Sequence, residues 1–358
     1  MNVFWREASP ARRAVGLWLL VIAAMIGVMV VLGGATRVSG SGLSIMEWAP
    51  LAGVVPPLSG AEWRRLFALY RQIPQYHLLH EGMDLAGFQH IFWLEWTHRL
   101  WGRLVGIAFL GPLIWFWARG AIERWLRPRL VLLFLLGGLQ GAVGWFMVAS
   151  GFFPDSTAVS PYRLVVHLAL ALVLYAALLW TGLSVLRPAP VAAPAAPRLL
   201  LLAVVALVAL TILAGGFTAG LHAGRVFNTF PLMDGRLLPA GYADLVPFLR
   251  NLTENVAAVQ FDHRLLATAT ALLAAATVAI GLARRQPPAL RRALAALGAL
   301  VALQYALGVA TLLRAAPAVL ATAHQAGAVL LLTAAIAALH AARGAVPARA
   351  LPLITETT

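Results

Sequence analysis

Two short stretches of the chain place a histidine and an arginine side by side near the beginning of an apolar segment. The first, Gln89 to Arg103 (QHIFWLEWTHRLWGR), carries Glu95 and His98 one helical turn apart. The second, Gln260 to Ala267 (QFDHRLLA), carries His263 in the corresponding place. An ionisable group inside a membrane segment is costly and by default marks function. We therefore expect both stretches to belong to functional sites.

Two further histidines, His167 and His324, lie near the beginnings of later apolar segments. One histidine from each of two neighbouring helices is an arrangement that binds haem iron from both sides. Zinc usually takes three or four N, O or S ligands, whereas each half of this chain offers two such histidines, so haem fits better. A lone intramembrane histidine is often only an interhelical hydrogen-bond partner, but four that recur in register favour ligation.

A carboxylate distinguishes the first histidine stretch from the second. Glu95 lies three residues before His98 and on the same helical face, while Val259 or Gln260 occupies the corresponding turn before His263. Histidines with an acidic group suit a haem on which chemistry is done, and histidines alone suit an electron-transfer or structural haem. The alternative for Glu95 is a local salt bridge to the arginine four residues later.

Arg99 and Arg264 directly follow the first histidine of each half. Their forked guanidinium groups could hold haem propionates, and the alternative is that they reach toward the membrane interface. Gln140 and Gln304 lie inside other apolar segments, where an interhelical hydrogen bond is the conservative explanation. The remaining histidines have no repeat-matched partner, and we expect them to be solvated or interfacial: His77, His80, His90, His222 and His340.

The composition is that of an integral membrane protein. Hydrophobic residues make up 61% of the 358 residues and charged residues 11%, and the mean hydropathy is +0.84, which no ordinary soluble domain reaches. Because a span needs about 20 apolar residues, the sequence predicts an all-α protein with eight transmembrane helices. They run approximately over Val15–Ala35, Ile91–Ala118, Leu130–Ser150, Tyr162–Leu186, Leu199–Ala219, Val259–Ala283, Ala293–Leu313 and Ala318–Ala341.

The charged residues and the absence of cysteine exclude several kinds of function. The net charge is +14, but the basic residues are arginines scattered between apolar spans, so no continuous stripe for a nucleic acid is formed. The chain has no cysteine, which excludes disulfides, thiolate metal sites and cysteine redox chemistry. Any redox activity therefore needs a bound cofactor.

Loop charge predicts how the chain crosses the membrane. Most loop arginines lie in the two tails and after the second, fourth and sixth spans, whereas the loops after the third and seventh spans hold only Arg163 and Arg314. The positive-inside rule then puts both termini in the cytoplasm. The long loops over residues 36–90 and 220–258 face outward, and all four histidines lie at similar depth near the outer face.

The two halves of the sequence repeat one another. GGATRVSG at Gly33 matches GGFTAGLHAG at Gly215, and LQGAVG at Leu139 matches LQYALG at Leu303. Four spans in each half imply parallel repeats related by an axis along the membrane normal, that is, two pseudo-symmetric four-helix bundles. We expect an N-terminal half over residues 1–190 and a C-terminal half over 191–358, joined by the proline-rich linker from Arg187 to Arg198.

Several motifs together resemble heme A synthase, in the class shared by alphaproteobacteria and mitochondria. The motifs are GGATRVSGSGLSIMEWAPLAGVVPP, IFWLEWTHRLWGRLVG, NTFPLMDG from Asn228 to Gly235, and QFDHR, and they occur in the family's order over most of the chain. The resemblance implies a bacterial inner-membrane enzyme that oxidises the methyl group of haem O, through an alcohol, to the formyl group of haem A. The product serves terminal oxidases, so haem O synthase and oxidase assembly factors are implied partners, alongside membrane lipid and a possible homo-oligomer.

The resemblance also implies roles for individual residues. His98 and His167 would flank the substrate haem with Glu95 as the catalytic carboxylate, and His263 and His324 would ligate a resident haem b. The outer-loop cysteine pair of other branches is absent here, and Gln89 and His90 stand where relatives tend to have a basic residue.

Two other classes of function remain open from the sequence. A dihaem membrane cytochrome for quinone-linked electron transfer would also need four histidines, but gives no reason for Glu95 in one half only. A haem or lipid transporter would be expected to have helices broken by glycine or proline at the midplane, whereas the strongest polar residues here lie near the outer face.

Overall fold

The protein is all-α, as the sequence predicts. The computed structural model describes residues 9–50, 52–187 and 198–344, and over these ranges it contains helices and no strand. Eight of the described helices are long and apolar enough to span a membrane. They are α1 (Pro10–Val38), α4 (Leu85–Ala118), α5 (Arg127–Ala149), α6 (Pro161–Leu186), α7 (Arg198–Gly220), α9 (Val256–Leu282), α10 (Pro288–Leu313) and α11 (Ala318–Ala341).

Side-chain caps mark the beginnings of α4 and α9. The Asp84 side chain accepts a hydrogen bond from the Gly87 amide at 2.8 Å, so α4 begins six residues before the expected Ile91 and carries His98 further from its end. Asn255 caps α9 by accepting from the Ala257 amide at 2.9 Å. Such caps satisfy amide donors that have no partner within the helix. The predicted linker, apart from its ends, lies outside the described residues.

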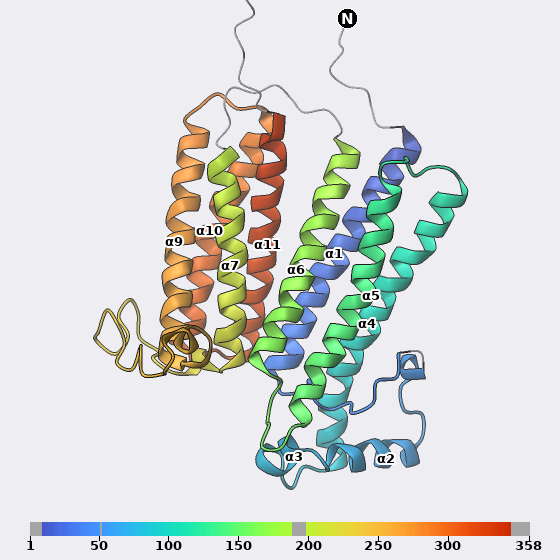
Figure 1. Ribbon diagram of the computed structural model, residues 1–358, viewed down its shortest axis with the longest axis vertical. Helices are drawn as coiled ribbons and strands as arrows, with labels where there is room; N and C mark the ends of the chain where they lie inside the picture. The colour runs from blue at the N-terminus through green and yellow to red at the C-terminus, as the bar shows by residue number, and fades with distance from the viewer. Residues whose placement is uncertain (1–8, 51, 188–197, 345–358) are drawn as a thin grey trace, which may run out of the picture.

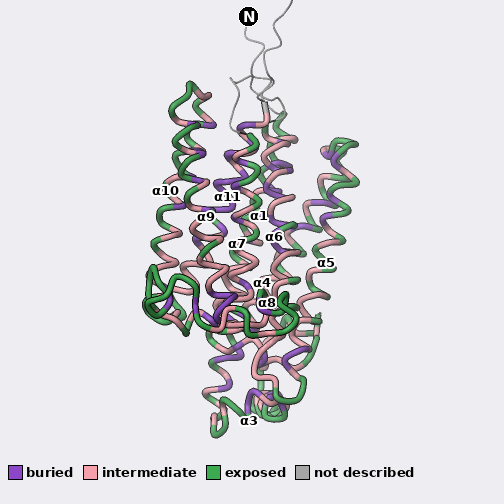
Figure 2. The backbone as a smooth tube through the Cα atoms, turned by 60° about the vertical axis from the view of Figure 1, so that its left-hand side comes forward, coloured by how far each residue is buried: buried purple, intermediate pink, exposed green. Residues whose placement is uncertain are grey.

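The spanning helices pack as two groups of four (Figure 1). The N-terminal group contains α1, α4, α5 and α6, and the C-terminal group contains α7, α9, α10 and α11. The groups meet where α1 packs against α11 and where α6 packs against α7 and α11. In the central window of α6, 44% of the residues are buried, against 6% in α5, so α6 lies inside the assembly and α5 at its periphery (Figure 2). The division into two functional halves stays a prediction.

Glycines allow the two groups to approach closely at one end. A Cβ added to Gly220, the last residue of α7, would lie 2.8 Å from Cβ of Pro161, the first residue of α6. Small residues at helix contacts are the usual means of close approach in membranes. Further along the interface, the Gln325 amide of α11 donates to the Val30 carbonyl of α1 at 2.7 Å. The Gln325 side chain fills the space that a Cβ on Gly34 would occupy.

The long loop before α4 is structured, which the sequence analysis did not anticipate. It contains α2 (Gly60–Tyr70) and α3 (Pro74–Leu79), which lie at one end of the N-terminal group in Figure 1. Tyr70 and Phe88 are fully buried there in an aromatic cluster that continues into α4. We call this end of the molecule the loop face; at the C-terminal group it carries α8 (Asn251–Glu254) and the segment over residues 221–250.

Replacing Gly220 by alanine should lower the stability of the assembled helices. The added methyl group meets the rigid Pro161 ring, which cannot swing away as a flexible side chain could, and overpacking of this kind costs about 1–3 kcal/mol. The measurement is the apparent melting temperature, read as monodisperse protein that survives heating in detergent. Gly106→Ala is the matched control, because nothing lies within 4 Å of the methyl group that it adds. Equal melting temperatures for the two variants would contradict the close α6–α7 contact.

Candidate functional site

Each of the four predicted histidines faces a glycine on the preceding spanning helix. A Cβ added to Gly33 of α1 would lie 3.0 Å from Nε2 of His98, and one added to Gly215 of α7 would lie 3.0 Å from Cε1 of His263. The same contact recurs at the other two histidines, where Gly144 of α5 would meet His167 at 2.9 Å and Gly308 of α10 would meet His324 at 3.0 Å. Any larger residue at these glycines would displace an imidazole.

The structure brings the four histidines together as two pairs. His98 of α4 lies near His167 of α6, and His263 of α9 lies near His324 of α11. All four histidines are half-buried. Among the described residues, no group of three or more histidine or carboxylate side chains is placed to hold a metal ion. Each site therefore offers two imidazoles, one from each of two helices.

The two intramembrane glutamines make the interhelical hydrogen bonds that the sequence analysis expected. Gln140 of α5 donates from Nε2 to the His167 carbonyl at 3.1 Å, and Gln304 of α10 donates to the His324 carbonyl at 2.9 Å. Each bond fixes the turn of helix that carries a histidine. The interhelical hydrogen bonds expected for Gln140 and Gln304 are confirmed.

The residues present fit a haem in each pair. The Nδ1 atoms of His167, His263 and His324 are buried and have no hydrogen-bond partner, although buried polar atoms in proteins are rarely left unpaired. Each imidazole packs directly against the backbone of a glycine, which holds the ring in place between two helices. Two imidazoles, one from each of two helices of the same group, are a suitable axial ligand set for haem iron.

Glu95 is buried, and it bonds both to Arg99 and to the loop that follows α1. The side chain is 2% exposed, and its Oε2 accepts from Ser44 Oγ at 2.7 Å and from the Ile45 amide at 2.9 Å. Its Oε1 accepts from Arg99 Nη2 at 2.6 Å, so the salt bridge considered from the sequence is present. Arg99 also donates to the carbonyls of Ile45 and Glu47 at 2.7 and 2.8 Å. Glu95 and Arg99 together fasten the loop that follows α1.

Gln260 holds the corresponding loop in the C-terminal group, but it donates hydrogen bonds to that loop where Glu95 accepts them. Its Nε2 donates to the carbonyls of Ala223 and Val226 at 2.7 and 2.5 Å, and its Oε1 accepts from Arg264 Nη2 at 3.0 Å. Arg264 further donates to loop carbonyls at residues 227 and 229, and its Nε is buried without a partner. The structure thus identifies Gln260, not Val259, as the counterpart of Glu95.

Sequence reasoning missed several residues of these sites and misjudged one histidine. The four glycines were visible as GG and LQ…G repeats, but only the packing shows that they face the histidines. Ser44, which donates to Glu95, carries no sequence signal of its own. His340 was expected to be interfacial, yet it is 2% exposed and contacts Ser184 and Arg343. It is buried because α6 and α11 cover it at the end opposite the loop face.

Comparison with known proteins identifies relatives over almost the whole chain. A family model described as "Cytochrome oxidase assembly protein" matches residues 16–336. The chain is 60% identical over 347 residues to heme A synthase of Granulibacter bethesdensis, covering 95% of this chain and 91% of that protein. It is 50% identical over 315 residues to heme A synthase 2 of Acidiphilium cryptum, covering 86% of each chain. No solved structure matches the chain.

Replacing Gln260 by glutamate should destabilise the C-terminal loop. A carboxylate oxygen would then face the Ala223 and Val226 carbonyl oxygens, and two hydrogen bonds would be lost. The expected cost is about 1–3 kcal/mol, measured as a lower apparent melting temperature and faster proteolysis over residues 221–229. Gln260→Met removes the same bonds without adding charge and should cost less. A glutamate variant as stable as the parent would show that these hydrogen bonds do not hold the loop.

Proposed function

Because the chain belongs to the heme A synthase family, we propose that its two histidine pairs divide the reaction of that family between them. The protein is a membrane oxidoreductase that converts haem O to haem A by oxidising a methyl group to a formyl group. We assign haem O to the pair His98–His167 and a resident haem b to the pair His263–His324. The observation that carries the assignment is that a buried carboxylate, Glu95, stands beside the first pair and an amide, Gln260, beside the second.

The N-terminal pair would hold the substrate so that its methyl group is within reach of Glu95. His98 and His167 would supply imidazole nitrogens, and close packing against Gly33 and Gly144 holds their rings in place. Bound haem O supplies the iron and the carbon to be oxidised. Removing hydrogen from carbon as electrons leave requires a proton acceptor, and the buried Glu95 carboxylate beside this pair would take that role. The loop fastened by Glu95 and Arg99 closes the site on the loop face and limits the entry of water.

The C-terminal pair would hold haem b without chemistry on the ring. The Gln260 amide fastens the adjoining loop but cannot take up a proton at neutral pH, so this site lacks a base at the corresponding position. Arg264 is the better of the two arginines for a propionate, because its buried Nε has no partner. Each Arg99 side-chain nitrogen already donates to Glu95 or to a loop carbonyl, so its role in propionate binding would require rearrangement.

The orientation and partners follow from the same assignment. With both termini in the cytoplasm of a bacterial cell, the loop face lies outside the inner membrane and both haem sites lie toward it. Haem O synthase would deliver the substrate, and oxidase assembly factors would receive the product. Gly220 and Gln325, which join the two helix groups, would keep the sites at a constant separation.

Replacing single histidines should separate the two sites. His263→Ala and His324→Ala should remove the low-spin haem b spectrum from the purified, membrane-inserted protein, because each removes one axial ligand. His98→Ala and His167→Ala should keep that spectrum but stop haem A formation, measured by extracting pigments from cells supplied with haem O. If His98→Ala instead removes haem b and spares haem A formation, the two pairs have been assigned the wrong way round.

Glu95→Gln should leave substrate haem bound but stop haem A formation, because the amide cannot accept a proton. Glu95→Asp should retain little activity, since moving the carboxylate by about 1 Å costs on the order of a hundredfold. Pigment analysis of cells expressing each variant is the measurement. Ser44→Ala is the matched control: it loses one bond to the same loop but keeps the carboxylate, and it should still make haem A. A glutamine variant that makes haem A at the parent rate would leave Glu95 only a loop-holding role.

A further inference from the structure

Arg37 lies in the last turn of α1 and reaches across to the C-terminal helix group. Its Nη2 donates to the carbonyl of Ala219 at the end of α7, so the side chain joins the two groups at the loop face (Figure 1). Its Nε is buried and has no hydrogen-bond partner. Because buried polar atoms in proteins are rarely left unpaired, this nitrogen marks a place for a ligand that accepts hydrogen bonds.

Arg37 lies one helical turn closer to the loop face than the glycine contacts of both histidine pairs. On α1, Gly33 packs against the His98 ring four residues before Arg37, and residues four apart share a helix face. On α7, Gly215 makes the corresponding contact of the C-terminal pair four residues before Ala219. The Arg37 side chain leaves α1 on the face that contacts His98, so it belongs with the N-terminal pair.

Arg37 is part of a cluster of basic side chains. Arg225 and His222, from the segment that follows α7, lie near it. Over the described parts of the chain, no salt bridge includes any of these three residues. Two arginines placed close together repel one another unless an anion lies between them. The cluster therefore favours an anionic ligand at the loop face.

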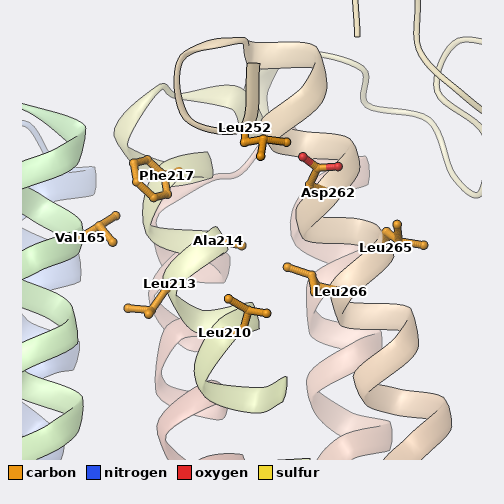
Figure 3. A pocket seen from close by; sticks show the side chains of 9 residues that line it. All are labelled: Val165, Leu210, Leu213, Ala214, Phe217, Leu252, Asp262, Leu265 and Leu266. Atoms are coloured by element: carbon orange, nitrogen blue, oxygen red, sulfur yellow. The ribbon is translucent and has the colours of Figure 1, made fainter. Parts of the chain in front are cut away.

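The groove between α6, α7 and α9 near the same end is not suited to an anion. It is lined by apolar side chains and by the carboxylate of Asp262 (Figure 3). Like charges repel one another, and the repulsion is stronger where water is excluded. An anion at this end of the molecule is therefore expected at Arg37 and not in the groove.

The anion that the proposed function brings to this region is a haem propionate. A haem carries two propionate carboxylates, and charged groups are costly in the hydrocarbon of a membrane. His167 lies in the second turn of α6, which begins at the loop face, so this is the nearer aqueous side for a haem at the N-terminal pair. Arg99 already donates to Glu95 and to loop carbonyls, whereas Arg37 has an unpaired Nε.

We propose that Arg37 binds a propionate of the substrate haem at the N-terminal pair. The proposal rests on the assignment of haem O to His98 and His167. At the matching place of the repeat the C-terminal half has Ala219, and Arg264 has the unpaired Nε there instead. Each haem would then meet one arginine with an unpaired Nε, which α1 supplies in one half and α9 in the other.

Chemical removal of the carboxylates tests this contact without turnover. Ferric haem O and its dimethyl ester, in which both propionates are neutral, are titrated into the purified protein in phosphatidylcholine nanodiscs, and binding is followed by the haem absorption spectrum. Arg37→Gln keeps a donor for the Ala219 carbonyl but loses the charge, and it should weaken binding of haem O about tenfold or more. The dimethyl ester should bind to the parent and to this variant with the same affinity.

Arg71→Gln is the matched control. It removes the same charge from the loop face, at a side chain that lies over the rings of Phe67 and Tyr76, and it should bind both ligands as the parent does. Arg37→Lys keeps the charge but not the forked donors, and it should recover part of the affinity that Arg37→Gln loses.

A loss of affinity in Arg37→Gln that is equal for haem O and its ester would overturn the proposal and leave Arg37 a structural bond between the helix groups. An equal loss in Arg71→Gln would also overturn it, since the effect would then be long-range attraction by net charge. Binding of haem O that persists in His98→Ala and in His167→Ala would contradict the proposed function, and this inference with it. Binding that requires both histidines but not Arg37 would contradict the inference alone.

Discussion

Close contact between an imidazole and a glycine backbone is the constraint on which the rest of the structure depends. Four such contacts, at Gly33, Gly144, Gly215 and Gly308, set the distance between neighbouring helices at the depth of the histidines. A bulky residue would force the helices apart or turn the ring away, and either change would separate the two imidazoles of a pair. The glutamine bonds from α5 and α10 to the histidine carbonyls then prevent those turns of helix from rotating.

Two residues at corresponding positions, Glu95 and Gln260, hold the loops of the loop face. One is a carboxylate and the other an amide. Glu95 accepts hydrogen bonds from its loop, and Gln260 donates them to its own. Both side chains hold their loops in place, but only the N-terminal site contains a buried carboxylate, Glu95. Glu95 therefore serves both the loop and the proposed chemistry, whereas Ser44 contributes one hydrogen bond to the same carboxylate.

In the packed structure, different faces of the same helix make different contacts, as α9 and α1 show. The same helix, α9, places His263 against Gly215 of α7 and Asp262 in a hydrogen bond with Tyr242 of the preceding loop. The same helix, α1, presents Gly33 to the N-terminal pair and bonds to the C-terminal group through the Val30 carbonyl. Neighbouring positions in the sequence therefore serve different environments, since successive residues on a helix point about 100° apart.

Hydropathy and loop lengths were sufficient to predict the eight spanning helices and the all-α membrane class, because these depend on composition and local pattern. The recurrence of short motifs also singled out four histidines, each of which the structure places against a glycine. The Glu95–Arg99 salt bridge, considered from the sequence as an alternative role for Glu95, is also present, because residues four apart on one helix lie side by side. What the sequence could not determine was which glycines face the imidazoles, that Ser44 and a distant loop amide bond Glu95, or that α2 and α3 occupy the first long loop. His340 was misjudged for the same reason: burial depends on which helices pack against one another, and such contacts join residues far apart in the chain.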